Sequence, residues 1–215
     1  KVTVTNPDGT KIETTYDQTD MLKGKAIQVS VYSGNLASKT TYTYSVTSLP
    51  VLFTKTAVTP LAPLRYWAYL AQADTALYGT NGAAIPGGVT RTSYQYNANY
   101  NLIMKQEYGG SGLPLYRTTT YVYYPNATNN ITGLPALQNV KDAGGTVVAQ
   151  TLNLYDGNTI YNTAPIYGRL SGTRTWVGGT QYTQTSYGYD AWGNQNSLTT
   201  YTGFGTYSSA PTTSA

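Results

Sequence analysis

Large or β-branched side chains alternate with small polar ones along almost the whole of this 215-residue chain. Val2 and Val4 are separated by Thr3, and the segment Ile27–Val31 repeats the pattern with Gln and Ser between its apolar residues. Successive side chains of a β-strand point to opposite faces, so such alternation gives each strand one apolar and one polar face. The pattern therefore predicts strands along most of the chain.

Pairs of tyrosines two residues apart are the most distinctive form of this alternation. The chain has 23 Tyr but only 2 Phe and 3 Trp, and both Tyr and Thr favour pleated, half-buried backbone. Each pair places two phenol rings on one face of a strand, where they can pack against neighbouring strands. The pairs are Tyr42 and Tyr44, Tyr94 and Tyr96, Tyr121 and Tyr123, and Tyr187 and Tyr189.

Short runs rich in Gly, Asn, Asp and Pro separate the alternating segments. Such residues form tight reversals, and strands joined in this way are antiparallel. We therefore expect an all-β fold made of antiparallel hairpins. One segment is ambiguous, because Pro63–Asp74 has enough Ala and Leu for three helical turns, whereas Tyr66 and Leu70 also fit one face of a strand; the surrounding strands favour the strand. The expected reversals are Asn6–Gly9, Ser33–Asn35, Asp142–Gly145 and Val177–Gly179.

The composition limits the partners that the chain can have. Charged residues make up only 10% of it, whereas a soluble domain usually has roughly a quarter, so hydroxyls and amides must cover the surface. The absence of Cys excludes disulfides and thiolate metal sites. The net charge of +4 comes from 13 Lys and Arg spread singly, whereas nucleic-acid-binding proteins concentrate them in a stripe. No apolar run reaches the roughly 20 residues that a membrane helix needs. We therefore expect neither nucleic acid nor a membrane span.

One seven-residue segment occurs twice. Thr92–Ala98 and Thr185–Ala191 begin 93 residues apart, agree at five of seven positions and differ at a sixth only by Asn for Asp. Weaker copies occur elsewhere, and the later members of the series begin about 27 to 34 residues apart, a length that suits one hairpin pair of a solenoid or spiral sheet. The alternative is that Tyr-x-Tyr between Thr residues is simply how strands look in this composition, but the shared Asn/Asp-Ala step favours a true repeat. The weaker copies lie at 39–44, 117–123 and 151–157.

The second copy continues into a sequence that resembles a known family. Tyr189–Asn194 resembles the YD-repeat core, Tyr-Asp-x-x-Gly-Asn/Arg, of RHS proteins, whose relatives include the shells of insecticidal toxin complexes and the extracellular part of teneurins. Partial copies are Tyr16 with Asp17, Tyr155–Asn158 and Tyr96–Asn101. In this motif Tyr packs on the neighbouring strand, Asp or Asn caps the reversal, and Gly supplies a positive φ. The repeat-motif residues that we expect to be structural are Tyr94, Tyr96, Asn97, Tyr155, Asp156, Gly157, Tyr187, Tyr189, Asp190 and Gly193.

The resemblance also implies an architecture and a role. In the family, the strands form a long spiral, solenoid-like sheet that closes into a hollow shell, which often encloses or displays a C-terminal effector. We therefore expect residues 1–207 to be one YD-repeat array, an RHS-type shell segment of a longer secreted or cell-surface bacterial protein, and 208–215 to be a weakly ordered Ser/Thr/Pro/Ala-rich end. The expected partners are neighbouring repeats, other copies of the chain that pair through edge strands into a filament, and an encapsulated effector. The Pro- and Asp-rich segment with which relatives cleave themselves is not found, so that activity is not expected.

No combination of residues indicates catalysis. His is absent, which excludes Ser-His-Asp, Cys-His and His–metal arrangements. Glycosidases need a pair of carboxylates, but most of the nine acids stand in turn sequences, where capping explains them. The sequence therefore predicts a non-enzymatic protein with no cofactor and no metal. The acids in turn sequences are Asp8, Asp142, Asp156 and Asp190.

The tryptophans suggest a second function. Trp67, Trp176 and Trp192, with their Tyr neighbours, could form an exposed platform for stacking sugar rings, which would make the chain an adhesin or a carbohydrate-binding module. We favour the alternative that these rings line the sheet and hydrogen-bond through their polar tips. Asn126 and Asn130 both stand in N-glycosylation sequences of one loop, which must be exposed if it carries glycans.

Overall fold

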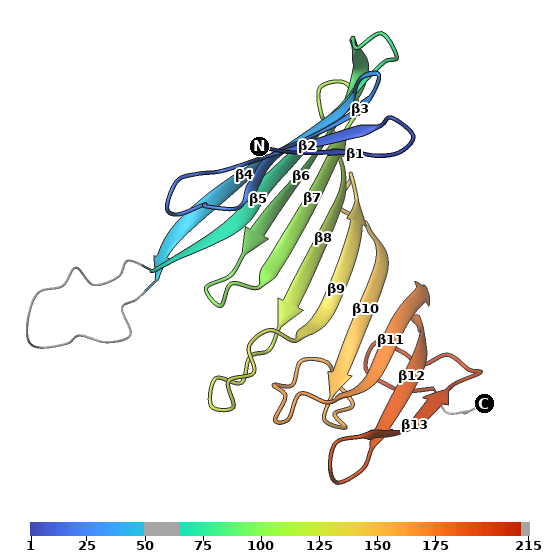
Figure 1. Cartoon of the computed structure of the whole chain (residues 1–215). Coiled ribbons are helices and arrows are strands. Elements are labelled where there is room, and N and C mark those ends of the chain that lie inside the picture. Colours follow the sequence, from blue (N-terminus) through green and yellow to red (C-terminus); the bar gives the residue numbers. More distant parts are fainter. Residues whose placement is uncertain (50–64, 212–215) are drawn as a thin grey trace, which may run out of the picture. The chain divides into compact units, whose positions relative to one another are not determined.

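The chain folds into antiparallel strands. The computed structural model describes residues 1–49 and 65–211, and these residues form thirteen strands and no helix (Figure 1). None of these residues therefore belongs to a helix that could cross a membrane. The expected all-β class is confirmed. The strands are β1 (Val2–Thr5), β2 (Lys11–Tyr16), β3 (Ala26–Ser33), β4 (Asn35–Leu49), β5 (Arg65–Tyr78), β6 (Ala84–Tyr96), β7 (Leu102–Gly109), β8 (Leu115–Tyr123), β9 (Pro135–Asp142), β10 (Val147–Tyr155), β11 (Leu170–Gly178), β12 (Gln181–Tyr189) and β13 (Gln195–Thr200).

The strands follow one another in the sheet in the order in which they occur in the chain, from β1 to β13. Each inner strand therefore pairs with the strand before it and the strand after it. By their contacts the residues form two compact units, unit 1 (Lys1–Tyr94 and Glu107–Leu115) and unit 2 (Gln95–Gln106 and Tyr116–Ala215). The segment that also fitted a helix is a strand from Arg65 onward, as the surrounding pattern favoured; the first two residues of that segment lie outside the described residues.

Five of the reversals share one hydrogen-bonding pattern. In each, the N–H of the first residue donates to the carbonyl of the fifth, and the N–H of the fourth donates to the carbonyl of the first, at 2.8 to 3.1 Å. The fourth residue has a positive φ, 63° at Tyr100 and 77° to 89° at the four glycines. A type I turn followed by a left-handed residue matches the twist of the flanking strands, and Gly adopts that conformation without a Cβ penalty. The five are Asn6–Thr10, Gly79–Ala83, Asn97–Asn101, Asp142–Thr146 and Asp190–Asn194.

All four reversals expected from the sequence join consecutive antiparallel strands. Asn6–Gly9 joins β1 to β2, and Asp142–Gly145 joins β9 to β10, both through the turn described above. Ser33–Asn35 joins β3 to β4 with Ser33 opposite Asn35, and Val177–Gly179 leads from β11 to β12. The two copies of the seven-residue segment also have the same surroundings, since each ends a strand and leads into the same kind of turn.

A tyrosine hydroxyl ties several strand pairs together at one end. In four pairs, a tyrosine of the even-numbered strand donates its O–H to the carbonyl of the first residue of the preceding strand, at 2.8 to 3.0 Å. The ring thus spans the end of a hairpin pair and satisfies a carbonyl at the strand's beginning. The bonds run from Tyr44 to Ala26, from Tyr123 to Leu102, from Tyr155 to Pro135 and from Tyr189 to Leu170.

The core of unit 2 lies on one face of its strands. Leu137, Leu152 and Arg174 stand directly opposite one another on β9, β10 and β11. Leu152 is 0% and Arg174 1% exposed, and Tyr182 packs in the same cluster as the two leucines. The next residue along the row is Gln184 on β12. The buried polar pair Arg174 and Gln184 therefore continues the row of buried leucines across the sheet.

Candidate functional site

The connection between β10 and β11, residues 156–169, is held at its start by one carboxylate. The Oδ2 atom of Asp156 accepts the N–H groups of Ile166, Tyr167 and Gly168 at 2.6, 3.0 and 3.2 Å. Its Oδ1 atom accepts the N–H of Arg169 at 2.9 Å, and the N–H of Asp156 donates to the carbonyl of Arg169 at 2.8 Å. Four successive backbone N–H groups thus form a concave anion site around one side chain. The end of the loop is fixed to its beginning.

We call the Asp156 carboxylate and the four N–H groups of residues 166–169 the Asp156 clamp. Its electrostatics favour the ionised form of the carboxyl group. Burial by itself would raise the pKa of Asp156, but the four backbone N–H donors outweigh that effect and hold the pKa below its usual value. Asp156 has a φ of 57° and Gly157 a φ of 77°, so the chain leaves β10 in the left-handed region, which Asp and Gly tolerate best. The N–H of Gly157 donates to Ser171 Oγ at 2.9 Å, which ties the loop's start to β11.

Two side chains of the clamp residues lie next to each other, Tyr167 exposed and Arg169 half-buried. The Tyr167 side chain is 74% exposed, and the Arg169 guanidinium lies over its ring, 5.5 Å from the centroid. Arg169 Nη1 also donates to the carbonyl of Asp190 at 3.5 Å, which is a long contact. A Cβ on Gly193 would lie 3.0 Å from Arg169 Nη2, so the turn after β12 adjoins this guanidinium. The two side chains therefore stand between the loop and the turn that follows β12.

A hollow of about 360 Å³ opens beside these side chains. Its polar lining comes from Asp156, Arg169 and Ser171, and its aromatic lining from the tyrosines of the loop and of β12. Its volume is at the lower end of the range of roughly 300–1,000 Å³ that is usual for small-ligand sites. The full lining is Asp156, Gly157, Ile166, Tyr167, Arg169, Ser171, Tyr187 and Tyr189.

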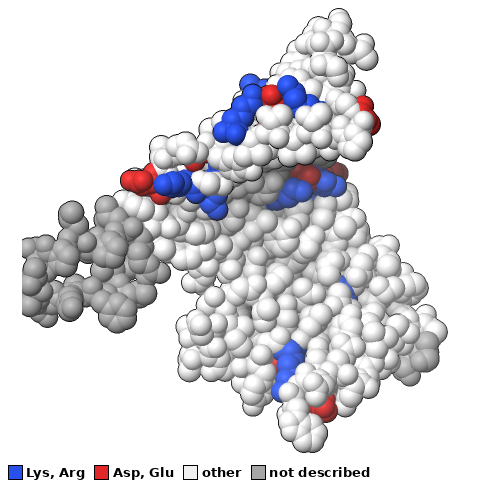
Figure 2. All heavy atoms as spheres, viewed as in Figure 1, with Lys and Arg blue, Asp and Glu red and all other residues white. Residues whose placement is uncertain are grey.

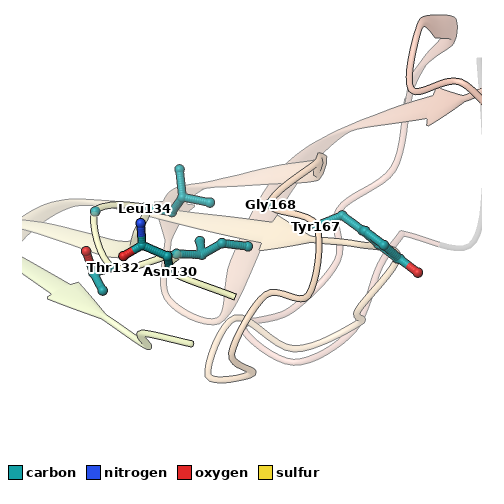
Figure 3. A pocket seen from close by; sticks show the side chains of 7 residues that line it. Asn130, Thr132, Leu134, Tyr167 and Gly168 are labelled. Atoms are coloured by element: carbon teal, nitrogen blue, oxygen red, sulfur yellow. The ribbon is translucent and has the colours of Figure 1, made fainter. Parts of the chain in front are cut away.

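A second hollow, of about 440 Å³, adjoins the end of the loop (Figure 3). It is lined by residues 130–134 together with Tyr167 and Gly168. Figure 3 shows that the ring of Tyr167 points away from Asn130 and Thr132. Gly168 has a φ of 78°, and this left-handed backbone favours glycine, whereas the nearest atom to an added Cβ, Leu134 Cδ1 at 2.9 Å, ends a flexible side chain. This second hollow has fewer functional side chains than the first.

Arg174 joins the 156–169 loop to the C-terminal segment, residues 205–211, on the core face of unit 2. Its Nε donates to Gln184 Oε1 at 2.7 Å, and its Nη1 donates to the carbonyls of Thr159 and Tyr207 at 3.0 and 3.2 Å. All three acceptors are neutral, although the side chain is only 1% exposed. Backbone bonds between Tyr182 and Gly205, at 2.8 and 3.0 Å, hold the same C-terminal segment against β12. The buried guanidinium is therefore a structural connector and not an open binding group.

Tyrosine rings complete the packing of that segment. The ring of Tyr207 contacts those of Tyr161 and Tyr182 edge-on, at centroid distances of 5.1 and 6.0 Å. Burial, followed by the effect of the Tyr161 side chain, raises the pKa of Tyr207 well above its ordinary value. Of the end expected to be weakly ordered, the structure describes residues 208–211, in which Ser209 Oγ lies 2.7 Å from Thr206 Oγ1 and Pro211 is buried.

The turn acids expected from the sequence have two different arrangements. Asp142 Oδ1 accepts the N–H of Thr146 at 2.9 Å, and Asp190 Oδ1 accepts the N–H of Asn194 at 2.8 Å, so both cap their own turns. Asp156 differs, because it binds N–H groups that follow it by 10 to 13 residues. Of the ten motif residues, Tyr94 and Tyr96 lie in β6, Asn97 in the turn after it, Tyr155 at the end of β10, Asp156 and Gly157 at the start of the loop, Tyr187 and Tyr189 in β12, and Asp190 and Gly193 in the turn after β12.

The three tryptophans have different surroundings within their own units. Trp67, in unit 1, stacks on Tyr69 with centroids 4.3 Å apart. Trp176 packs against the core of unit 2 and donates its Nε1–H to the carbonyl of Gly179 at 3.0 Å. Trp192 is 85% exposed and lies in the turn after β12. Trp176 lies in β11, opposite Tyr182 near the start of β12. Trp176 and Trp192 are therefore separated by most of the length of β12.

The two glycosylation sequences lie in the loop between β8 and β9. Asn130 is exposed and has a φ of 56°. Asn126 is half-buried, and its Nδ2 donates to the carbonyl of Pro165 at 3.0 Å. Attachment of a glycan at Asn126 would thus replace a hydrogen bond to the 156–169 loop, whereas Asn130 is accessible.

Tyr167 and Arg169 were not identified from the sequence. Their one signal is negative: the alternation stops between Tyr155 and Leu170, which marks an unusually long connection. Charge gives no further signal on the face drawn in Figure 2, where charged side chains occupy a few separate places among broad uncharged areas. The densest described ion cluster joins Glu13 to Lys1 and Lys11 at 2.8 and 3.0 Å.

Comparison with known proteins gives a likeness of fold. No family model and no curated protein sequence matches the chain. The crystal structures of TcdB2-TccC3-Cdc42 and TcdB2-TccC3 each match 74% of this chain and 10% of their own, with a TM-score of 0.51 and 12% sequence identity. The chain thus spans about a tenth of the length of these chains. At this identity the likeness is one of strand arrangement alone.

Proposed function

We propose that the chain is a structural β-scaffold, one segment of an RHS-type shell on a secreted or cell-surface bacterial protein. The observation that carries the proposal is the strictly sequential order of thirteen strands in one sheet. Such a sheet grows by adding a hairpin at a time, and each added hairpin covers the edge left by the one before it. The likeness to part of two toxin-complex structures agrees with this role.

The surface supports the same role. Threonines stand opposite one another on consecutive strands, as do Thr151, Thr175 and Thr183. Such rows support sheet pairing through side-chain contacts. We propose that the partners are further repeats on either side and an effector that the completed shell encloses or displays. The chain itself then acts through its shape and not through a reaction.

The experiment tests whether the first strand accepts another strand. The isolated chain is followed by sedimentation velocity and electron microscopy from micromolar to millimolar concentration. Edge strands with unpaired N–H and C=O groups invite pairing, so we expect concentration-dependent assembly. In an edge strand, one of two neighbouring residues points its N–H toward the open edge and the other toward the paired strand. Thr3→Pro and Val4→Pro are therefore compared, and the variant that removes the N–H at the open edge should assemble less.

Two outcomes contradict the edge-pairing proposal. One is a monomer at every concentration. The other is assembly that neither proline variant reduces, although circular dichroism shows both to be folded. Val148→Lys serves as a surface control, since Val148 is 52% exposed on the inner strand β10 and its replacement should leave assembly unchanged.

A further inference from the structure

The 360 Å³ hollow beside the 156–169 loop has unused hydrogen-bonding capacity of both kinds. Within the described residues, no carboxylate lies within ion-pair distance of the Arg169 guanidinium, and its one hydrogen bond is the 3.5 Å contact with the Asp190 carbonyl. A guanidinium has five N–H donors, so most remain free. Asp156 Oδ2 accepts three bonds, but Oδ1 accepts only one and keeps an acceptor position. Two residues that line the hollow therefore keep unused donors and an unused acceptor.

The charges of the lining select against ionic ligands. Asp156 and Arg169 both line the hollow, and their opposite charges leave it without a net charge. A carboxylate ligand attracted by Arg169 would be repelled by Asp156. An ammonium ligand attracted by Asp156 would be repelled by Arg169. The arrangement suits a neutral ligand that both donates and accepts hydrogen bonds.

Aromatic rings supply the remaining feature. The ring of Tyr167 is largely exposed beside the hollow, and the backbone that carries it is held by the hydrogen bonds of the Asp156 clamp. Tyr187 lines the hollow from β12, with Leu198 of β13 directly opposite it and 59% exposed. An exposed ring on a fixed backbone can pack on an apolar ligand face with little loss of conformational entropy.

We propose that this hollow binds one neutral pyranose ring of a glycan. A pyranose has an apolar C–H face for Tyr167 and a rim of hydroxyls that can accept from Arg169 and donate to Asp156 Oδ1. Trp192, 85% exposed in the turn that adjoins Arg169, is placed to contact the next sugar unit. The site goes beyond the scaffold role and does not depend on it, and it differs from a platform of three tryptophans.

The test uses the intact chain and sugars of one ring type with different charges. Saturation-transfer NMR is recorded with the methyl glycosides of glucose, galactose, mannose and N-acetylglucosamine. The corresponding methyl glucuronide and glucosaminide carry a negative and a positive charge on the same ring. We expect at least one neutral glycoside to bind and both charged analogues to bind at least about fivefold more weakly.

Matched variants locate the site. Tyr167→Ala and Arg169→Met should each weaken the binding of the neutral sugar by about tenfold. Tyr116→Ala is the control, because Tyr116 is 49% exposed and lies under Arg117 at 5.7 Å, in β8 outside the hollow. The proposal is overturned if no neutral glycoside binds, if a charged analogue binds more tightly, or if Tyr167→Ala and Tyr116→Ala have equal effects.

Discussion

Asp156 is the residue on which the most backbone groups depend. Its carboxylate satisfies four N–H groups of the loop that it begins. Hydrogen bonds to a charged group each contribute about 1.5–3 kcal/mol, but bonds to one acceptor are not additive. The loop therefore depends on one side chain to a degree that none of the other turn acids reaches.

Replacing Asp156 with Asn should release the end of the loop. The amide keeps one oxygen but brings an N–H₂ group against backbone donors, so we expect a loss of about 2–3 kcal/mol in the free energy of unfolding. Urea unfolding measures the loss, and amide exchange at Ile166 and Gly168 should accelerate. Asp142→Asn is the control, because it affects one N–H bond and should cost about 0.5–1 kcal/mol. Equal effects of the two substitutions would contradict the clamp.

Arg174 presents the opposite situation, a buried cation whose partners are all neutral. Its removal as Arg174→Met leaves Gln184 Oε1 and the carbonyls of Thr159 and Tyr207 without this donor. Gln184 is buried, and a buried acceptor without a partner costs about 1–3 kcal/mol, whereas Thr159 and Tyr207 are exposed residues whose carbonyls can bind water. We therefore expect a net loss of about 1–3 kcal/mol, measured by urea unfolding.

The same substitution has a local consequence. The C-terminal segment loses its bond at Tyr207, so limited proteolysis should cut residues 205–211 of Arg174→Met sooner than those of the unmodified chain. A variant of unchanged stability and unchanged proteolysis would mean that the cost of burying the charge equals the gain from its three bonds.

At the scale of the element, the turn geometry makes a sharp prediction in the hairpin between β9 and β10. Gly145 has a φ of 86° and nothing within 4 Å of an added Cβ, so Gly145→Ala tests conformation alone. A left-handed residue with a Cβ is less stable by about 1–2 kcal/mol, and thermal or urea unfolding should show that loss. Gly144→Ala, in the same turn but without a positive φ, should change stability by less than about 0.5 kcal/mol.

Equal losses at these two glycines would mean that the turn does not impose the left-handed conformation. Tyr100 provides an independent check, because it has a φ of 63° at the equivalent position of the turn after β6. There, Tyr100→Gly should relieve strain, which the greater entropy of an unfolded glycine partly offsets. We therefore expect opposite signs at Gly145 and Tyr100.

Strands and most reversals could be predicted from the sequence because their signals are local. Alternation needs only neighbouring residues, and an Asx residue followed by Gly three places on specifies its own turn, as at Asp190 and Gly193. The Asp156 clamp could not be predicted, since Tyr155–Asn158 resembles the other turn copies and its bonding partners come 10 to 13 residues later. The position of Arg174 depends on register across three strands, which single-strand periodicity does not specify.

At the scale of the whole molecule, the few charged groups are set for neutral and not for acid conditions. Lys1 and then Lys11, through their bonds to the carboxylate, lower the pKa of Glu13 to about 2. Five other carboxyl groups also have a lowered pKa, because N–H and O–H groups donate to them. At Asp74 and Asp156 the largest single effect is burial, which raises the pKa, but the hydrogen bonds together outweigh it. The five groups are Asp8, Asp17, Asp74, Asp156 and Asp190.

The pH dependence of stability follows from these directions. A carboxyl group whose pKa is lower in the folded state stabilises the fold above its unfolded pKa, about 3.9 for Asp and 4.3 for Glu, and this contribution disappears as the pH falls through the folded value. The chain has no His, so no side chain of ordinary pKa titrates between about pH 5 and pH 8. The free energy of unfolding, measured by urea titration, should therefore be level over that range and fall below about pH 4, and Glu13→Gln should reduce the fall. A decline that begins near pH 6, or constant stability down to pH 2, would show that these carboxylates do not stabilise the folded sheet.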